Sequence, residues 1–229
     1  MYSGTMQRDT EATERLRVDA ERNRSRILEA AQADFAERGL DVPLEAVAER
    51  AGVGIATLYR RFPTRDDLIA ACFERRLEEY ATAAEEALDA ADGWSGFCAY
   101  VQRVCSMQAA DRGFNDVLTR SFSNAKGLEA HRDRGYGLSV RLIERAQAEG
   151  TLRADFVPED LVLLLMANAG VVGAAGRAAP DAWRRLVGLM LDGFRAEGAT
   201  ELPPPPSPRQ MFMAMQRLAK PADETRSVL

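Results

Sequence analysis

LEAVAERAGVGIATLYRRF, residues 44–62, is the stretch that decides the fold of this chain. Its apolar residues recur at helical spacing on both sides of a glycine-containing break at 52–54. They are Leu44, Val47, Ala48 and Ala51 before the break, and Ile55, Leu58 and Phe62 after it. The pattern predicts a helix, a tight turn and a second helix. Because helices this short are unstable alone in water, both must pack on a third helix.

The third helix is predicted just upstream, over residues 22–38. Ile27, Ala31 and Phe35 fall on one face of it, and Gly39 follows where a helix should end. In this arrangement the second short helix buries Leu58 and Phe62 and turns its other side outward. Arginine, tyrosine and threonine side chains on that side suit DNA phosphates and base edges. The alternative is an ordinary helical hairpin with a solvated charged face.

The order of residues in and after this stretch resembles the TetR/AcrR family of bacterial transcriptional regulators. The resemblance rests on Ala51-Gly52-Val53, Thr57-Leu58-Tyr59, Phe62, Thr64, Arg65 and Leu68. It implies a three-helix DNA-binding head on an all-helical body that binds a ligand and dimerises. It also implies a repressor that a small molecule releases from its operator.

The family's DNA-contacting positions are carried over one by one. In the recognition helix they fall on Ile55, Ala56, Thr57, Tyr59, Arg60 and Arg61. The basic residue after that helix falls on Arg65, and we add Thr64 beside it and Arg24 from the arginine-rich stretch upstream. Members often start each motif helix with a hydroxyl residue, whereas this chain has Val42-Pro43 and Gly54 there. Any phosphate contact from those two side chains is therefore lost.

Composition and charge bear on which partners and which cell compartment to expect. The net charge of −5 argues against nucleic acid for the chain as a whole, but arginines cluster at the head. Three cysteines without a close pair, and no secretory signal at the start, predict a reduced, cytoplasmic protein. The most apolar run, 161–175, is shorter than the roughly 20 residues that cross a bilayer, so no membrane association is expected.

The predicted fold class is all-α, with a helix-turn-helix head joined by a long helix to a helical body. Residues 1–19 are expected to form a flexible arm and residues 20–66 the DNA-binding domain. Residues 67–200 form the ligand-binding and dimerisation domain, and residues 201–229 a proline-rich spacer with a short C-terminal helix. Thr64 with Asp67 three residues later predicts the start of the long joining helix.

The middle of the chain holds most of the aromatic residues, which predicts a small-molecule pocket there, although plain core is the alternative. The expected lining is Trp94, Phe97, Tyr100, Val104, Met107, Phe114, Leu118, Phe122, Tyr136, Val140 and Asn168. Two later apolar helices, after Pro158 and after Pro180, are expected to form the homodimer face. The expected interface residues there are Leu164, Val171, Ala175, Trp183, Val187, Met190 and Phe194.

Enzyme motifs fail on inspection of the sequence. The single histidine leaves little for a catalytic triad or a histidine metal site. Ser123 and Lys126 have serine-lysine spacing without a companion motif. We therefore predict no catalytic residue, metal or cofactor. The expected function is a homodimeric repressor of a palindromic double-stranded DNA operator, released by an unknown small-molecule effector. The alternative is a helical small-molecule-binding protein or enzyme without DNA binding.

Overall fold

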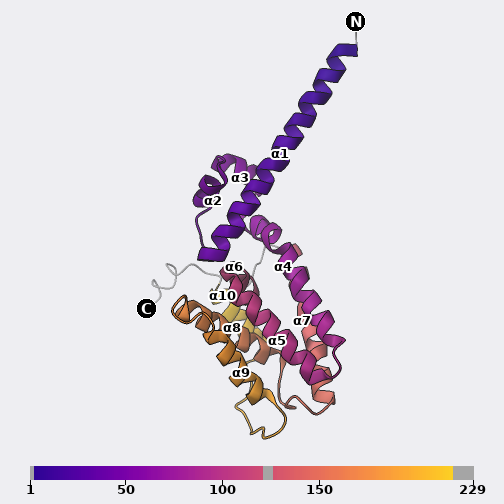
Figure 1. The fold of residues 1–229 in the computed structure, drawn as a ribbon, viewed down its shortest axis with the longest axis vertical. Helices are drawn as coiled ribbons and strands as arrows, with labels where there is room; N and C mark the ends of the chain where they lie inside the picture. Colours follow the sequence, from indigo (N-terminus) through magenta and orange to yellow (C-terminus); the bar gives the residue numbers. More distant parts are fainter. Residues whose placement is uncertain (1–2, 121–125, 219–229) are drawn as a thin grey trace.

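The computed structural model describes the backbone of residues 3–120 and 126–218, and the side chains of 18–120 and 127–217. Within these ranges the chain is all-helical, which confirms the predicted class (Figure 1). The helices are α1 Ser3–Arg38, α2 Leu44–Ala51, α3 Ile55–Arg61, α4 Arg65–Leu88, α5 Gly93–Ala110, α6 Arg112–Thr119, α7 Lys126–Ala148, α8 Pro158–Ala175, α9 Ala182–Phe194 and α10 Pro208–Leu218.

Helices α1, α2 and α3 form the head, as the periodicity predicts. Ile27 and Phe35 of α1 are fully buried against Val47 of α2 and Leu58 of α3. Gly39 ends α1 with a positive φ of 82°. The three helices therefore share one apolar centre, and neither short helix has to be stable alone.

Helix α1 begins earlier than predicted. The flexible arm was expected over residues 1–19, but the backbone is helical from Ser3 onward and projects beyond the head (Figure 1). Residues 3–19 contain no proline and include five Glu and Arg residues, which favour helix over irregular chain. The flexibility of this segment stays a prediction.

Helix α4 joins the head to the body and packs along α7 (Figure 1). Its start is the capping box that the sequence predicts: the Thr64 hydroxyl accepts from the Asp67 backbone N–H at 3.1 Å. The Asp67 carboxylate accepts from the Thr64 N–H at 3.0 Å. Two backbone donors are thus satisfied at a helix end where they would otherwise be unpaired.

Head and body meet at a second place besides α4. The loop between α1 and α2 touches α6, where Arg120 forms a bidentate ion pair with Asp41 at 2.8 and 2.9 Å. The Leu40 backbone N–H also donates to the Asp116 carboxylate at 2.9 Å. Buried Phe35 of α1, Phe73 of α4 and Phe114 of α6 also pack together, the first pair stacked and the second tilted.

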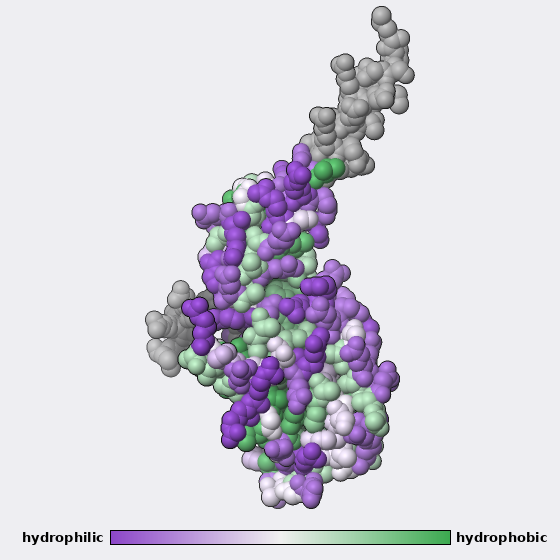
Figure 2. Space-filling model, in the orientation of Figure 1, coloured by the Kyte–Doolittle hydropathy of each residue, from purple (hydrophilic) through white to green (hydrophobic). Residues whose placement is uncertain are grey.

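Helix α8 is long and apolar enough, by length and composition alone, to cross a membrane. Only 22% of its residues are buried within the chain, because one face packs on α5 and α9 and the other faces out. Figure 2 shows hydrophobic side chains reaching the surface of the body in the region of α8 and α9. An uncovered apolar helix face suits contact with another protein surface.

The C-terminal helix α10 returns to the body and packs on α8. Its Met211 is buried, whereas Met213 on its outer side is half exposed. The sequence predicts a short amphipathic helix here that docks on the body or on a partner subunit. The structure places it on the body of its own chain.

Candidate nucleic-acid interface and ligand cavity

The turn of the helix-turn-helix depends on Gly52. This residue ends α2 in the left-handed conformation, with φ 63°, and the Val53 N–H donates back to the Ala48 carbonyl at 3.0 Å. Arg26 of α1 donates to the Gly52 carbonyl at 3.3 Å, and a Cβ on Gly52 would overlap its guanidinium. Glycine is favoured here by the backbone angle, and its lack of a Cβ leaves room for Arg26 in this position.

An ion-pair cluster fixes α2 on α1. The Asp34 carboxylate is fully buried and accepts from Arg50 of α2 at 2.7 Å and from Arg38. Arg50 also pairs with Glu37 at 3.2 Å. Because α3 follows α2 after a tight turn, the cluster also sets the direction in which α3 points.

Helix α3 presents the predicted residues on one short outer surface. Leu58 and Phe62 are buried beneath it, while Tyr59 is 45% exposed. Arg60 and Arg61 are exposed and have no hydrogen-bond or ion-pair partner among the described residues. Ala56 is exposed as well, and Ile55 and Thr57 are half-buried. Figure 2 shows this part of the head as mainly hydrophilic.

Three of the predicted DNA contacts have roles inside the chain. Arg65 donates to the backbone carbonyls of Leu40 at 2.7 Å and Val42 at 2.8 Å, which fastens the α1–α2 loop to the start of α4. Thr64 caps α4, and the guanidinium of Arg24 lies 5.7 Å from the centre of the Phe62 ring. DNA contact by these residues stays a prediction, and it would have to coexist with these bonds.

The start of α3 lacks a side-chain cap, because its N-cap residue is Gly54. A Cβ at Gly54 would meet nothing within 4 Å, and its φ of −72° suits any residue. Gly54→Ser should therefore cap α3, and its free energy of unfolding should exceed that of Gly54→Ala by about 1 kcal/mol. Urea denaturation of both variants measures this difference, and equal midpoints would contradict it.

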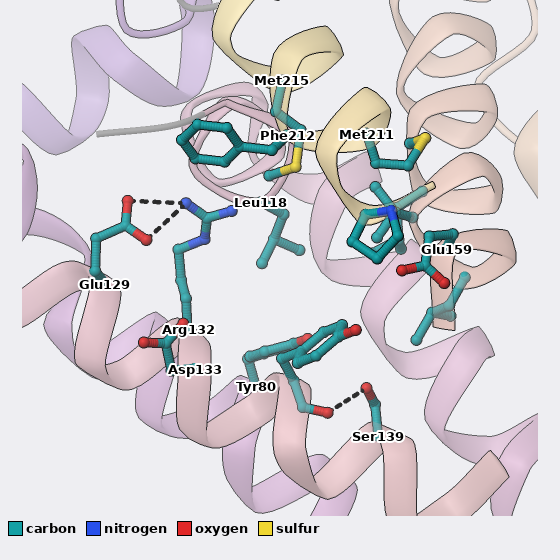
Figure 3. A pocket seen from close by; sticks show the side chains of 15 residues that line it. Tyr80, Leu118, Glu129, Arg132, Asp133, Ser139, Glu159, Met211, Phe212 and Met215 are labelled. Carbon is teal, nitrogen blue, oxygen red and sulfur yellow. Dashed lines mark hydrogen bonds and ion pairs between the residues drawn. The ribbon is translucent and has the colours of Figure 1, made fainter. Parts of the chain in front are cut away.

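The body contains a cavity of about 320 Å³, within the size range of small-molecule sites. Residues of α4, α6, α7, α8 and α10 line it (Figure 3). Of the residues predicted to bind ligand, Leu118 and Tyr136 line this cavity, and ligand binding by them stays a prediction. The lining residues that the sequence did not single out are Tyr80, Glu129, Arg132, Asp133, Ser139, Glu159, Leu161, Val162, Leu165, Pro208, Met211, Phe212 and Met215.

The other residues predicted to bind ligand, as far as the structure describes them, lie elsewhere. Phe97, Tyr100, Val104, Met107 and Phe114 are buried in the packed core. Trp94 and Val140 are half-buried away from the cavity, and Phe122 lies outside the described residues. Asn168 is fully buried and donates to the Gln108 side chain at 2.8 Å. The prediction that the buried members of this set line the cavity is therefore wrong: they belong to the packed core, because aromatic residues at helical spacing occur in both places.

The cavity has a polar side and an unpaired carboxylate opposite (Figure 3). Arg132 donates to Glu129 at 3.2 Å and to the Arg120 carbonyl at 2.9 Å. Glu159 has no ion-pair or hydrogen-bond partner in the described part of the chain. Burial raises the pKa of the Tyr80 phenol, and burial followed by the charge of Glu159 raises the pKa of Tyr136. Both phenols are therefore neutral at pH 7.

Part of the predicted dimer interface faces inward. Leu164, Trp183 and Val187 are buried in the core of their own chain, so they cannot form a surface for a partner. Val171, Ala175, Met190 and Phe194 are half-buried. The outward side of α8 and α9 instead carries Leu163, which is 41% exposed, and Leu189, which is 59% exposed.

A glycine-bent helix pair held on a third helix, with free arginines on the second, defines the helix-turn-helix class of DNA-binding proteins. Residues 27–72 match the family model "Bacterial regulatory proteins, tetR family". Residues 94–196 match the model "Transcriptional regulator SbtR-like, C-terminal domain". The chain therefore belongs to the TetR family of DNA-binding transcriptional regulators, a non-enzymatic family.

The chain is also similar to individual proteins. The chain is 37% identical over 68 residues to an HTH-type transcriptional regulator of Staphylococcus aureus (strain USA300); the match spans 29% of this chain and 37% of the regulator's length. The TetR transcriptional regulator SCO0520 from Streptomyces coelicolor is 32% identical, with 75% of this chain and 98% of that chain covered and a TM-score of 0.48. RolR in complex with resorcinol is 18% identical, covers 89% of this chain and 96% of its own, and has a TM-score of 0.51.

Proposed function

We propose that this regulator is a repressor that binds a palindromic operator as a homodimer and is released by a small molecule. The observation that carries the proposal is the outer surface of α3. Arg60 and Arg61 are exposed and unpaired among the described residues, next to half-exposed Tyr59. Arginine is the side chain that most often reads guanine in the major groove, by two parallel hydrogen bonds. Direct readout by α3 would take place in the cytoplasm, where the DNA is.

The homodimer is supported by the outward side of α8 and α9. Leu163 and Leu189 are exposed there, beside Gly170, Gly173 and Gly188, whose surroundings are open. Small residues let a partner's helices approach closely, and leucines supply the apolar area. A two-fold pair of α8–α9 faces would give a symmetric interface and two heads for two operator half-sites.

Release by a ligand is supported by the cavity and its connections to the head. Tyr80 of α4 and Leu118 of α6 line the cavity. The same two helices hold the head through Phe73 and through the Arg120–Asp41 ion pair. A ligand that shifts α4 against α6 would change the head's orientation. A coupling of about 1.4 kcal/mol already lowers operator affinity tenfold. RolR, a structural relative, holds resorcinol in its crystal structure.

Selection of bound genomic fragments, followed by gel retardation at 50 and 200 mM salt, tests this function. We expect tight, sequence-selective retardation whose affinity falls about a thousandfold or more between the two salt concentrations, for on the order of six phosphate contacts. Sedimentation equilibrium should give twice the chain mass of 25.2 kDa. A monomer that retards all fragments equally would contradict the proposal.

A further inference from the structure

The described residues that line the cavity carry net negative charge. They include three carboxylates, those of Glu129, Asp133 and Glu159, and one guanidinium, that of Arg132. Arg132 is already balanced by Glu129 at 3.2 Å, and it also bonds the Arg120 carbonyl. Nη1 makes both contacts, and an anionic ligand at Arg132 would compete with Glu129 for the guanidinium charge. The charged group that the cavity can best accommodate is therefore a cation.

Glu159 is the carboxylate placed to meet that cation. It lies in the first turn of α8, where the helix dipole favours a negative charge. Figure 3 shows it next to Met211, across the open space from Arg132. Its charge contributes to the raised pKa of Tyr136, so it acts electrostatically on another residue of the lining. Asp133 is exposed on α7, so its charge faces solvent.

The rest of the cavity suits an aromatic ring. Met211, Phe212 and Met215 of α10 cover it, and Tyr80 lies opposite them (Figure 3). Thioether sulfurs contact aromatic rings favourably, and the faces of neutral phenols attract cations. A Cβ on Gly135 of α7 would overlap the Tyr80 ring, so this glycine lets α7 hold the ring in place.

We propose that this cavity binds a compact aromatic cation, with its ammonium group against Glu159 and its ring beneath α10. The inference rests on the proposed function only in taking the cavity as the effector site. It gives α10 a role: the helix that follows the proline spacer supplies the apolar cover of the ligand. Helix α10 packs on α8, which carries Glu159. In this arrangement α8 contacts the ammonium group of the ligand and α10 contacts its ring.

Calorimetric titration of the full chain, without DNA, tests the charge preference with three probes that share one ring. They are benzyltrimethylammonium, benzyl alcohol and phenylacetate. The cation should bind at least about tenfold more tightly than the other two probes. Glu159→Gln should weaken the cation about tenfold and leave benzyl alcohol unchanged, which also shows that the cavity is intact. Glu144→Gln removes an exposed charge of α7 outside the cavity and should change nothing.

Three results would overturn the inference. They are equal affinity for the cation and the alcohol, tighter binding of phenylacetate that Arg132→Gln abolishes, and no binding of any probe at millimolar concentration. The titration contains no DNA, so these results leave operator binding by α3 untouched. A chain that binds the cation but retards no DNA fragment when the cation is absent would instead contradict the proposed regulator function.

Discussion

Replacing both Arg60 and Arg61 with alanine should reduce specific operator affinity by about a thousandfold or more. Each bidentate contact to a base contributes about 1 to 3 kcal/mol. The proposed homodimer would lose both arginines from each of its two subunits, so the losses add up. Fluorescence anisotropy with a labelled operator at 150 mM salt measures the loss. Neither side chain has a partner among the described residues, so the free energy of unfolding should stay within about 0.5 kcal/mol of wild type.

A matched control separates this effect from simple loss of charge. Arg75 of α4 is 86% exposed and lies outside the α3 surface, so Arg75→Ala should leave operator affinity unchanged. Arg60→Lys and Arg61→Lys keep the charge but lose the planar fork of donors. If the arginines read bases, the lysine variants should lose selectivity while keeping the salt dependence. Wild-type affinity in the double alanine variant would rule out α3 as the reading helix.

The head could be predicted from sequence because its determinants are local. The apolar spacing of 44–62 and the glycine at 52 fix the two helices and the turn, and the structure agrees with both. The role of Arg65 could not be predicted in this way. Its acceptors, the carbonyls of Leu40 and Val42, are more than 20 residues away in sequence and become neighbours only once α1, α2 and α4 have packed.

The cavity lining and the predicted homodimer face were harder to predict from sequence, for a different reason. The cavity is completed by Met211 and Met215 of α10, from the far end of the chain. On α8 both faces are apolar, so periodicity cannot tell which of Leu163 and Leu164 points inward. Burial is a property of the whole packed bundle, and an all-round apolar helix carries no signal of direction.

Phe73→Ala should lower the free energy of unfolding by about 3 to 5 kcal/mol, the usual cost of removing a buried phenylalanine ring. Phe73 is 2% exposed, and its ring centre lies 6.2 Å from that of Phe35 and 6.5 Å from that of Phe114. A Cβ on Gly113 would lie 2.7 Å from its ring, so packing around it is tight. Urea denaturation measures the loss. The control Phe212→Ala, a half-exposed ring of α10, should cost about 1 kcal/mol or less.

The same substitution tests how the cavity communicates with the head. Phe73 joins α1 of the head to α4 and α6, the two helices that also line the cavity. A cavity in place of the ring would let α4 move without turning α1. Benzyltrimethylammonium should then still bind Phe73→Ala, at a temperature where the variant is folded, but lower its operator affinity less than in wild type. A wild-type ligand response in a destabilised Phe73→Ala would show that coupling runs through the Arg120–Asp41 contact instead.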